Sequence, residues 1–90
     1  MRIEFDPRKN ALNLRKHGVE LWEGDGVLAD PLAVTIEDLS VAGEQRFVTI
    51  GANVFGVVMV AVWAGRPETI RIISVRRARP KERGRYEEGI

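Results

Sequence analysis

The chain has 90 residues, of which 44% are hydrophobic and 30% are charged, and it contains no cysteine and one histidine. This length suits one domain, and the composition is that of a globular protein rather than a disordered or fibrous one. Without cysteine there is no disulfide framework, thiolate zinc site or cysteine nucleophile, and one histidine argues against a protein zinc site. We therefore predict a single domain over residues 1–90 that uses no metal and no other cofactor.

The net charge of +1 conceals an uneven distribution along the chain. Counting Lys and Arg against Asp and Glu, residues 1–18 carry +3, residues 19–65 carry −6 and residues 66–90 carry +4. If the fold brings the two basic ends together, they form a positive face that attracts phosphates and leave the acidic middle for a different partner. Solvated surface charge without a particular role accounts for the same distribution equally well.

No segment has the pattern of a membrane anchor or a secretory signal. The first six residues, Met-Arg-Ile-Glu-Phe-Asp, are not apolar, and the longest apolar run, residues 57–64, is far too short to cross a bilayer. We expect a cytoplasmic protein with no membrane partner.

The N-terminal segment predicts a short strand followed by a helix. Ile3 and Phe5 form the strand, and Asp6 is a helix N-cap followed by Pro7, which fits the first helical position. Gly18 is expected to end this helix because glycine accepts the left-handed conformation common at helix C-termini.

A second, shorter helix is predicted over residues 21–28. Gly24 and Gly26 weaken that prediction, since a glycine in a helix interior costs about 1 kcal/mol relative to alanine. Asp30-Pro31 then breaks the chain, because the residue before a proline is biased away from helix.

From residue 33 onward the pattern changes to strand. We predict four antiparallel strands over residues 34–37, 46–50, 57–63 and 69–75, separated by connections at 38–43, 51–56 and 65–67. Residues 57–63 are apolar throughout and should form a central strand that is covered on both faces. In the last strand, strict alternation places Ile70, Ile72 and Ser74 on one face and Arg71, Ile73 and Val75 on the other.

Pro80 can open a terminal helix that includes residues 81–88, with Gly84 as a weak position. The predicted order is therefore strand, two helices, four antiparallel strands and a helix. This is an α+β fold with one antiparallel sheet of about four to five strands, two N-terminal helices and one C-terminal helix.

The densest group of cations is residues 76–83, with the sequence Arg-Arg-Ala-Arg-Pro-Lys-Glu-Arg. Arginine suits phosphate because its planar guanidinium donates two parallel hydrogen bonds and stays charged. If the last strand continues, Arg76 lies on the face of Ser74 and Arg77 on the opposite face, so that one of them points into a groove. The alternative is that these arginines solvate a strand end and pair with the glutamates that follow.

His17 is the one side chain whose ordinary pKa lies near neutrality, which makes it the natural candidate for proton transfer in phosphodiester cleavage. It sits at a predicted helix C-terminus, where the dipole favours the imidazolium, and beside Lys16, which disfavours it. A lone histidine at a helix end is more often a surface or capping group than a catalyst.

Four further side chains have two interpretations each. Arg46 either pairs with Glu44 or reaches a phosphate, and Tyr86 either donates to a phosphate or packs its ring against the sheet. Trp22 and Trp63 can stack on bases, but their places in a helix and a central strand favour core or interface roles. The residue patterns alone thus indicate a small α+β domain with a basic face, for which nucleic acid is one candidate ligand.

Ordered blocks spanning about residues 3 to 88 resemble the BrnT toxin family. These blocks are Phe5-Asp6 with residues 13–19, Asp30-Pro31, residues 44–51, and residues 71–78 together with Glu82-Arg83 and Tyr86-Glu87. The resemblance implies a toxin of a bacterial type II toxin-antitoxin system with a fold similar to the RelE ribonucleases. It also implies RNA cleavage that slows translation. A further implication is a tight hetero-oligomeric complex with a BrnA-like antitoxin, and the toxin contacts operator DNA only through this antitoxin.

The resemblance carries over six polar positions as candidate catalytic residues, namely Lys16, His17, Arg46, Arg76, Arg77 and Tyr86. In a RelE-like mechanism the RNA 2′-hydroxyl attacks the adjacent phosphate, which calls for a base, an acid and cations. The arginines would supply the cations, and His17 or Lys16 would take part in proton transfer, with the assignment of base and acid left open. No metal is required by this chemistry.

Two other hypotheses remain beside the ribonuclease toxin. The chain is alternatively a non-catalytic, toxin-like module that binds its antitoxin and nucleic acid. A sequence-specific DNA-binding protein acting alone fits less well, because the chain shows no helix-turn-helix pattern and its cations cluster at a strand end.

Overall fold

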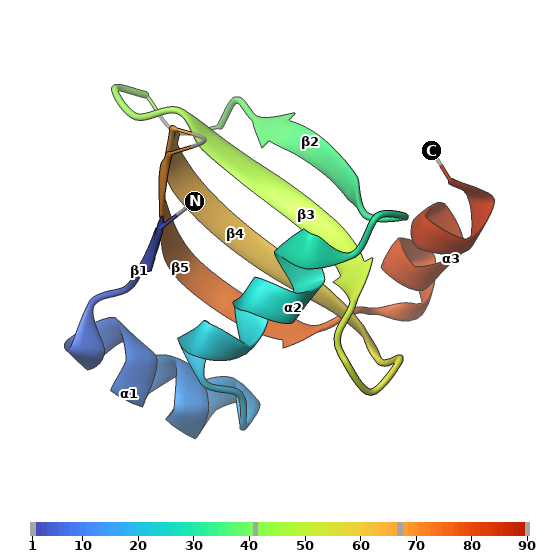
Figure 1. Ribbon diagram of the computed structural model, residues 1–90, viewed down its shortest axis with the longest axis horizontal. Coiled ribbons are helices and arrows are strands. Elements are labelled where there is room, and N and C mark those ends of the chain that lie inside the picture. Colours follow the sequence, from blue (N-terminus) through green and yellow to red (C-terminus); the bar gives the residue numbers. More distant parts are fainter. Residues whose placement is uncertain (1, 41, 67, 90) are drawn as a thin grey trace.

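The structure is a computed structural model that describes residues 2–40, 42–66 and 68–89. It is one five-stranded sheet with helices, as predicted for an α+β fold (Figure 1). The elements in chain order are β1 (Arg2–Glu4), α1 (Pro7–His17), the 3-10 helix η1 (Leu21–Glu23), α2 (Gly24–Ala29), β2 (Val34–Asp38), β3 (Arg46–Ala52), β4 (Val58–Arg66), β5 (Thr69–Arg77) and α3 (Pro80–Glu88).

The sheet has the strand order β1-β5-β4-β3-β2, with the apolar strand β4 at its centre as predicted. Strands β2 to β5 form an antiparallel meander, but β1 pairs with β5 in parallel. The four predicted antiparallel strands are confirmed, whereas the sheet as a whole is mixed because its fifth strand, β1, joins it in parallel. No hairpin joins β1 to β5, since the whole intervening chain separates them, so no turn imposes the antiparallel direction on this pair.

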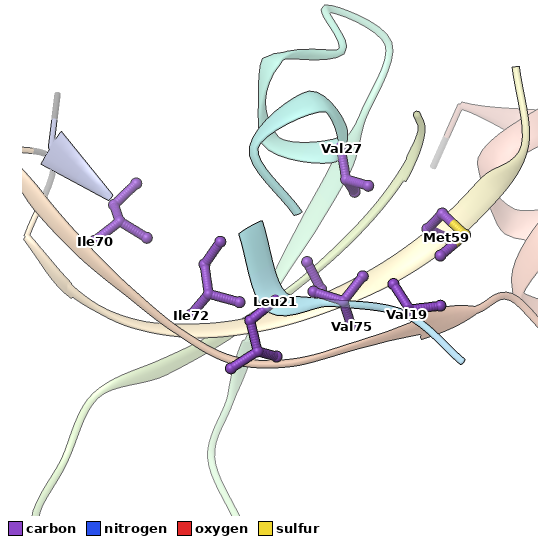
Figure 2. Packing of buried hydrophobic residues seen from close by; sticks show 8 residues of the cluster. Val19, Leu21, Val27, Met59, Ile70, Ile72 and Val75 are labelled. Atoms are coloured by element: carbon purple, nitrogen blue, oxygen red, sulfur yellow. The ribbon is translucent and has the colours of Figure 1, made fainter. Parts of the chain in front are cut away.

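The core lies between one face of the sheet and the segment formed by α1, η1 and α2. Figure 2 shows the buried side chains of this layer, in which Leu21 and Val27 from the helices meet Ile72 and Val75 of β5. Leu21, Val27 and Val75 are completely buried. We call the side of the sheet that carries Ile72 and Val75 the core face. The core thereby fixes the helical segment against β5, and this contact positions the site described below.

A β-bulge in β5 overturns the predicted alternation of its side chains. Trp63 pairs with Ile72 and Val62 pairs with Ser74, so Ile73 is the extra residue. The bulge brings Val75 onto the same face as Ile72, and both are buried in the core. Beyond the bulge the alternation resumes, with Arg76 opposite Val60 and Arg77 opposite Met59.

The predicted helix over residues 21–28 is instead a 3-10 turn, η1, followed by the short helix α2. Its first glycine lies in a close contact with β5, because a Cβ on Gly24 would lie 3.0 Å from side-chain atoms of Ile72 and of Val75. From the opposite side, a Cβ on Gly51 of β3 would lie 2.7 Å from the backbone oxygen of Val27. Both glycines therefore allow α2 to approach the sheet more closely than a side chain permits.

Helix α1 begins and ends as predicted. Asp6 accepts a hydrogen bond from the Arg8 backbone NH at 2.9 Å, and Gly18 ends the helix with φ of 71°. On the buried side of α1, the Asn13 amide donates to the backbone oxygens of Val19 and Val75, each at 2.8 Å, and its oxygen accepts from the Val75 NH at 3.2 Å. One polar side chain thus joins the end of α1 to the end of β5.

The remaining element, α3, packs less deeply than the others. None of its residues is buried, and this C-terminal helix packs against β3 (Figure 1). The predicted turn at residues 65–67 begins later than expected, because β4 continues to Arg66, and Pro67 lies outside the described residues. Within the described part of the chain, no helix is long and apolar enough to cross a membrane.

Candidate functional site

Two of the predicted residues, His17 and Arg77, line the same pocket. Gly18 turns the chain directly after His17, and Arg77 ends β5 on the core face, opposite Met59. We call this space, which has a volume of about 440 Å³, the basic pocket. Its lining residues are His17, Gly18, Val19, Glu23, Asn53, Phe55, Val57, Met59 and Arg77. The predicted meeting of the two basic ends of the chain therefore occurs here, where the end of α1 faces the end of β5.

The surroundings of His17 favour its neutral form. Its pKa is lowered from the ordinary value of 6.5, first by partial burial and then by the positive charges of Lys16, Arg76 and Arg79. The helix dipole acts in the opposite direction, because it favours the imidazolium at a helix C-terminus. A larger fraction of His17 is thus neutral near pH 7, and a neutral imidazole can accept a proton.

Arg76 points away from the basic pocket and binds Glu82 of α3. Two parallel hydrogen bonds of 2.8 Å and 2.7 Å join its guanidinium to the two carboxylate oxygens, and both side chains are 24% exposed. This contact and the Arg79 backbone NH lower the pKa of Glu82 to about 2. The contact also raises the pKa of Arg76, so the pair stays ionised. Of the two interpretations of this arginine, the structure shows the pairing with a following glutamate.

Arg46 lies on the same face of the sheet as Arg76 but at the other end. It pairs in register with Ala64, whereas Arg76 pairs with Val60, so four residues of β4, or roughly 13 Å, separate their positions along the strand. Glu44 accepts from Arg46 Nε at 3.1 Å and also binds Arg71. Arg46 is therefore held by Glu44, one of its two predicted alternatives, and does not line the basic pocket.

Tyr86 joins α3 to the segment that follows α2. Its hydroxyl donates to Asp30 at 2.6 Å, and the same carboxylate accepts from the backbone NH groups of Ala52 at 2.8 Å and Leu32 at 3.0 Å. The pKa of Asp30 is lowered by these donors, with the Tyr86 hydroxyl the largest cause. In this structure Tyr86 fastens α3 rather than facing His17.

The family described as the ribonuclease toxin, BrnT, of type II toxin-antitoxin systems matches residues 5–82. The chain belongs to the BrnT toxin family. No curated protein matches the chain.

A solved BrnT structure has the same fold. The crystal structure of the Brucella abortus ribonuclease toxin BrnT superposes with a TM-score of 0.64 and covers 88% of this chain and 97% of its own. The two sequences are 21% identical, so the similarity concerns the fold.

On this BrnT fold the six predicted residues fall into separate places. His17 and Arg77 share the basic pocket, Lys16 is exposed beside His17, and Arg76 flanks it from the other face of the sheet. Arg46 and Tyr86 lie elsewhere. Asp30, which binds Tyr86, and Arg71, which binds Glu44, were not among the predicted site residues. Both belong to the blocks that resemble the BrnT family.

Phe55, which also lines the basic pocket, was missed as well. It lies in the connection between β3 and β4, where the only signal in the sequence is an aromatic residue in a segment that should be polar.

Proposed function

We propose that this chain is an endoribonuclease toxin that cuts RNA at the basic pocket and thereby inhibits translation. The family supports the class of activity. The observation that carries the proposal is the placement of His17, with a lowered pKa, in one pocket with Arg77. This arrangement combines a proton acceptor with a fixed positive charge.

The chemistry we propose is attack by the RNA 2′-hydroxyl on the adjacent phosphorus. Neutral His17 accepts the 2′-hydroxyl proton while the new oxygen–phosphorus bond forms, and Arg77 stabilises the charge on the non-bridging oxygens. The bond to the 5′-oxygen breaks, and this oxygen takes up a proton from solvent or from a cationic side chain such as Lys16. The products are a 2′,3′-cyclic phosphate and a 5′-hydroxyl. All these steps use side chains and solvent, so the reaction needs no metal.

The remaining arginines have supporting roles in this proposal. Arg76 contributes positive potential next to His17 while it anchors α3 through Glu82. Arg46 and Arg71 form a second cationic group on the opposite face, where they extend the surface that attracts the RNA backbone. We assign Tyr86 to holding α3 in place.

The test is cleavage of bulk RNA in EDTA by the purified chain and by three variants. His17→Gln and Arg77→Ala should each lower the rate by at least tenfold, whereas Lys9→Ala, which removes an exposed cation from the same helix, should not. The wild-type rate should fall as the pH drops below the lowered pKa of His17, because protonation removes the base. Equal rates for all four folded proteins would refute the assignment of the pocket.

A non-catalytic module that binds its antitoxin and nucleic acid is the second candidate. It is favoured by the observation that Arg46 and Arg76 are both engaged by carboxylates within the chain. The two candidates differ in cells, where a cleaving toxin arrests growth and a binding module does not. Growth arrest that is lost in Arg77→Ala but kept in Lys9→Ala would favour cleavage at the basic pocket.

The type II family implies an antitoxin, and we propose that this partner is BrnA-like. Such an antitoxin would neutralise the toxin by forming a stable hetero-oligomer and would provide the only contact with operator DNA. Co-expression with a BrnA-like protein should relieve growth arrest, and the two chains should elute together in size-exclusion chromatography. Separate elution at micromolar concentration would contradict this assignment.

A further inference from the structure

An apolar groove lies directly beside the basic pocket, between α2 and the turn that joins β3 to β4. It has a volume of about 410 Å³ and is lined by Trp22, Glu23, Asp25, Gly26, Ala29, Asn53, Val54 and Phe55. We call it the aromatic groove. Trp22 is 56% exposed, Val54 82% and Phe55 85%. Such an exposed group of large apolar side chains is unfavourable in water and marks a binding surface.

Hydrogen bonds hold the Trp22 ring and the backbone turn that carries Phe55. The Trp22 indole NH donates to Glu20 at 2.9 Å, which fixes the orientation of the ring. The turn that carries Phe55 is held by Asn53, whose side-chain oxygen accepts from the NH groups of Phe55 and Val57 at 2.9 Å and 3.0 Å. The Gly56 NH donates to the Asn53 backbone oxygen at 2.9 Å. The Trp22 ring and the backbone of the turn are therefore ordered before a ligand binds, which lowers the conformational entropy lost on binding.

The groove and the basic pocket share the lining residues Glu23, Asn53 and Phe55, so one ligand can occupy both. Their chemistry differs in a way that matches the two ends of a nucleotide. The basic pocket offers His17 and Arg77 to a phosphate, and the carboxylate of Glu23, which accepts from the Glu20 backbone NH at 2.9 Å, lies where the two spaces meet. The groove offers aromatic carbon to a planar group, and Asp25 on its rim repels phosphate but can accept a hydrogen bond from an exocyclic amino group.

We propose that the aromatic groove binds one unpaired nucleobase of the RNA whose phosphate lies in the basic pocket. This inference rests on the proposed function. It makes single-stranded RNA the substrate class, because a base in a duplex is paired and stacked and cannot enter the groove. Stacking on aromatic side chains tolerates all four bases, so the groove selects for unpaired RNA more than for sequence.

The test measures binding separately from cleavage. The probes are single-stranded 2′-O-methyl hexaadenylate, which lacks the attacking hydroxyl, and an abasic hexamer with the same phosphates. Binding of the hexaadenylate should quench the fluorescence of Trp22, and the abasic hexamer should bind about tenfold more weakly without quenching. Pairing the hexaadenylate with a complementary strand should also abolish the quenching.

Variants identify the groove as the place of binding. Phe55→Leu and Trp22→Leu remove one aromatic ring each and should bring the affinity for hexaadenylate to that for the abasic hexamer. Leu39→Ala, which removes an exposed apolar side chain in the connection between β2 and β3, should bind like the wild type. Equal affinities of the wild type for both hexamers, without quenching, would overturn the proposal and leave the groove to a protein partner.

The two proposals fail in different ways. A wild-type chain that binds hexaadenylate with quenching but leaves RNA intact in EDTA would refute cleavage and keep the base-binding groove. A chain that cuts RNA but binds both hexamers equally would do the reverse.

Discussion

The Arg76–Glu82 pair predicts a specific dependence of stability on pH. The pKa of Glu82 falls from the ordinary 4.5 to about 2 in the folded chain, and each pKa unit corresponds to about 1.4 kcal/mol, so its ionised form stabilises the fold by about 3 kcal/mol. Because the folded pKa is the lower one, this stabilisation is complete above about pH 4.5 and disappears as the pH falls towards about 2. Glu82→Gln should therefore destabilise the protein near neutrality and progressively less in acid.

The assay is urea unfolding of the wild type and Glu82→Gln at several pH values between 2 and 7. A difference of about 3 kcal/mol at pH 7 is a large part of the 5–15 kcal/mol that stabilises a typical domain. Glu87→Gln is the matched control, because Glu87 is exposed on the same helix, and it should change the free energy of unfolding little at any pH. A difference that is small at pH 7, or that does not shrink between pH 5 and 2, would refute the reasoning.

Three further substitutions test contacts that hold the site in place. Asn13→Ala should lower the free energy of unfolding by about 3 kcal/mol or more, because it leaves buried backbone groups without partners. Leu12→Ala, on the exposed side of α1, should lower it much less, and similar losses for the two variants would contradict this. Tyr86→Phe should speed tryptic cleavage within α3 while the rest of the chain stays resistant, and an unchanged digestion pattern would rule out the tether. Gly51→Ala should lower the free energy of unfolding by about 1–3 kcal/mol, because the new methyl group clashes with α2. Gly84→Ala meets no neighbouring atom and should raise the free energy of unfolding by about 0.5–1 kcal/mol. Equal effects of the two substitutions in calorimetry would show that α2 shifts without cost.

The elements that the sequence predicted well are those with strong local signals. Asp6, Pro7 and Gly18 determine both ends of α1 through caps that need no tertiary contact. The apolar run of β4 predicted a central strand, and the strand order confirms that position. The resemblance of ordered blocks to the BrnT family was confirmed by the match over residues 5–82.

The features that the sequence did not predict depend on contacts between distant segments. The bulge at Ile73 shifts Val75 to the core face, and the strict alternation of residues gives no sign of it. Gly24 is unfavourable in a helix interior, yet it allows close packing on β5, and only the folded arrangement shows this contact. The parallel pairing of β1 likewise follows from the path of the whole chain.

The candidate site was predicted only in part for the same reason. His17 and Arg77 are 60 positions apart in the sequence, and what places them together is the packing of α1 on β5, including the contacts of Asn13. Arg46 and Tyr86 have the right chemistry, but their partners Glu44 and Asp30 place them in other parts of the fold. The sequence shows which residues are cations, whereas only the structure shows which of them lies at the basic pocket.

The neighbouring residues Arg76 and Arg77 show why that separation matters for interpreting variants. Strand alternation directs Arg77 to the basic pocket and Arg76 to Glu82 of α3. Loss of cleavage in Arg76→Ala would thus have two sources, a weaker positive potential at His17 and a loosened helix that leaves Glu82 without its partner. Arg77 makes no such structural pair within the described residues, so Arg77→Ala removes charge from the pocket with little effect on the fold. A comparison of the two variants at equal stability separates a cation that acts on the phosphate from one that holds the structure around it.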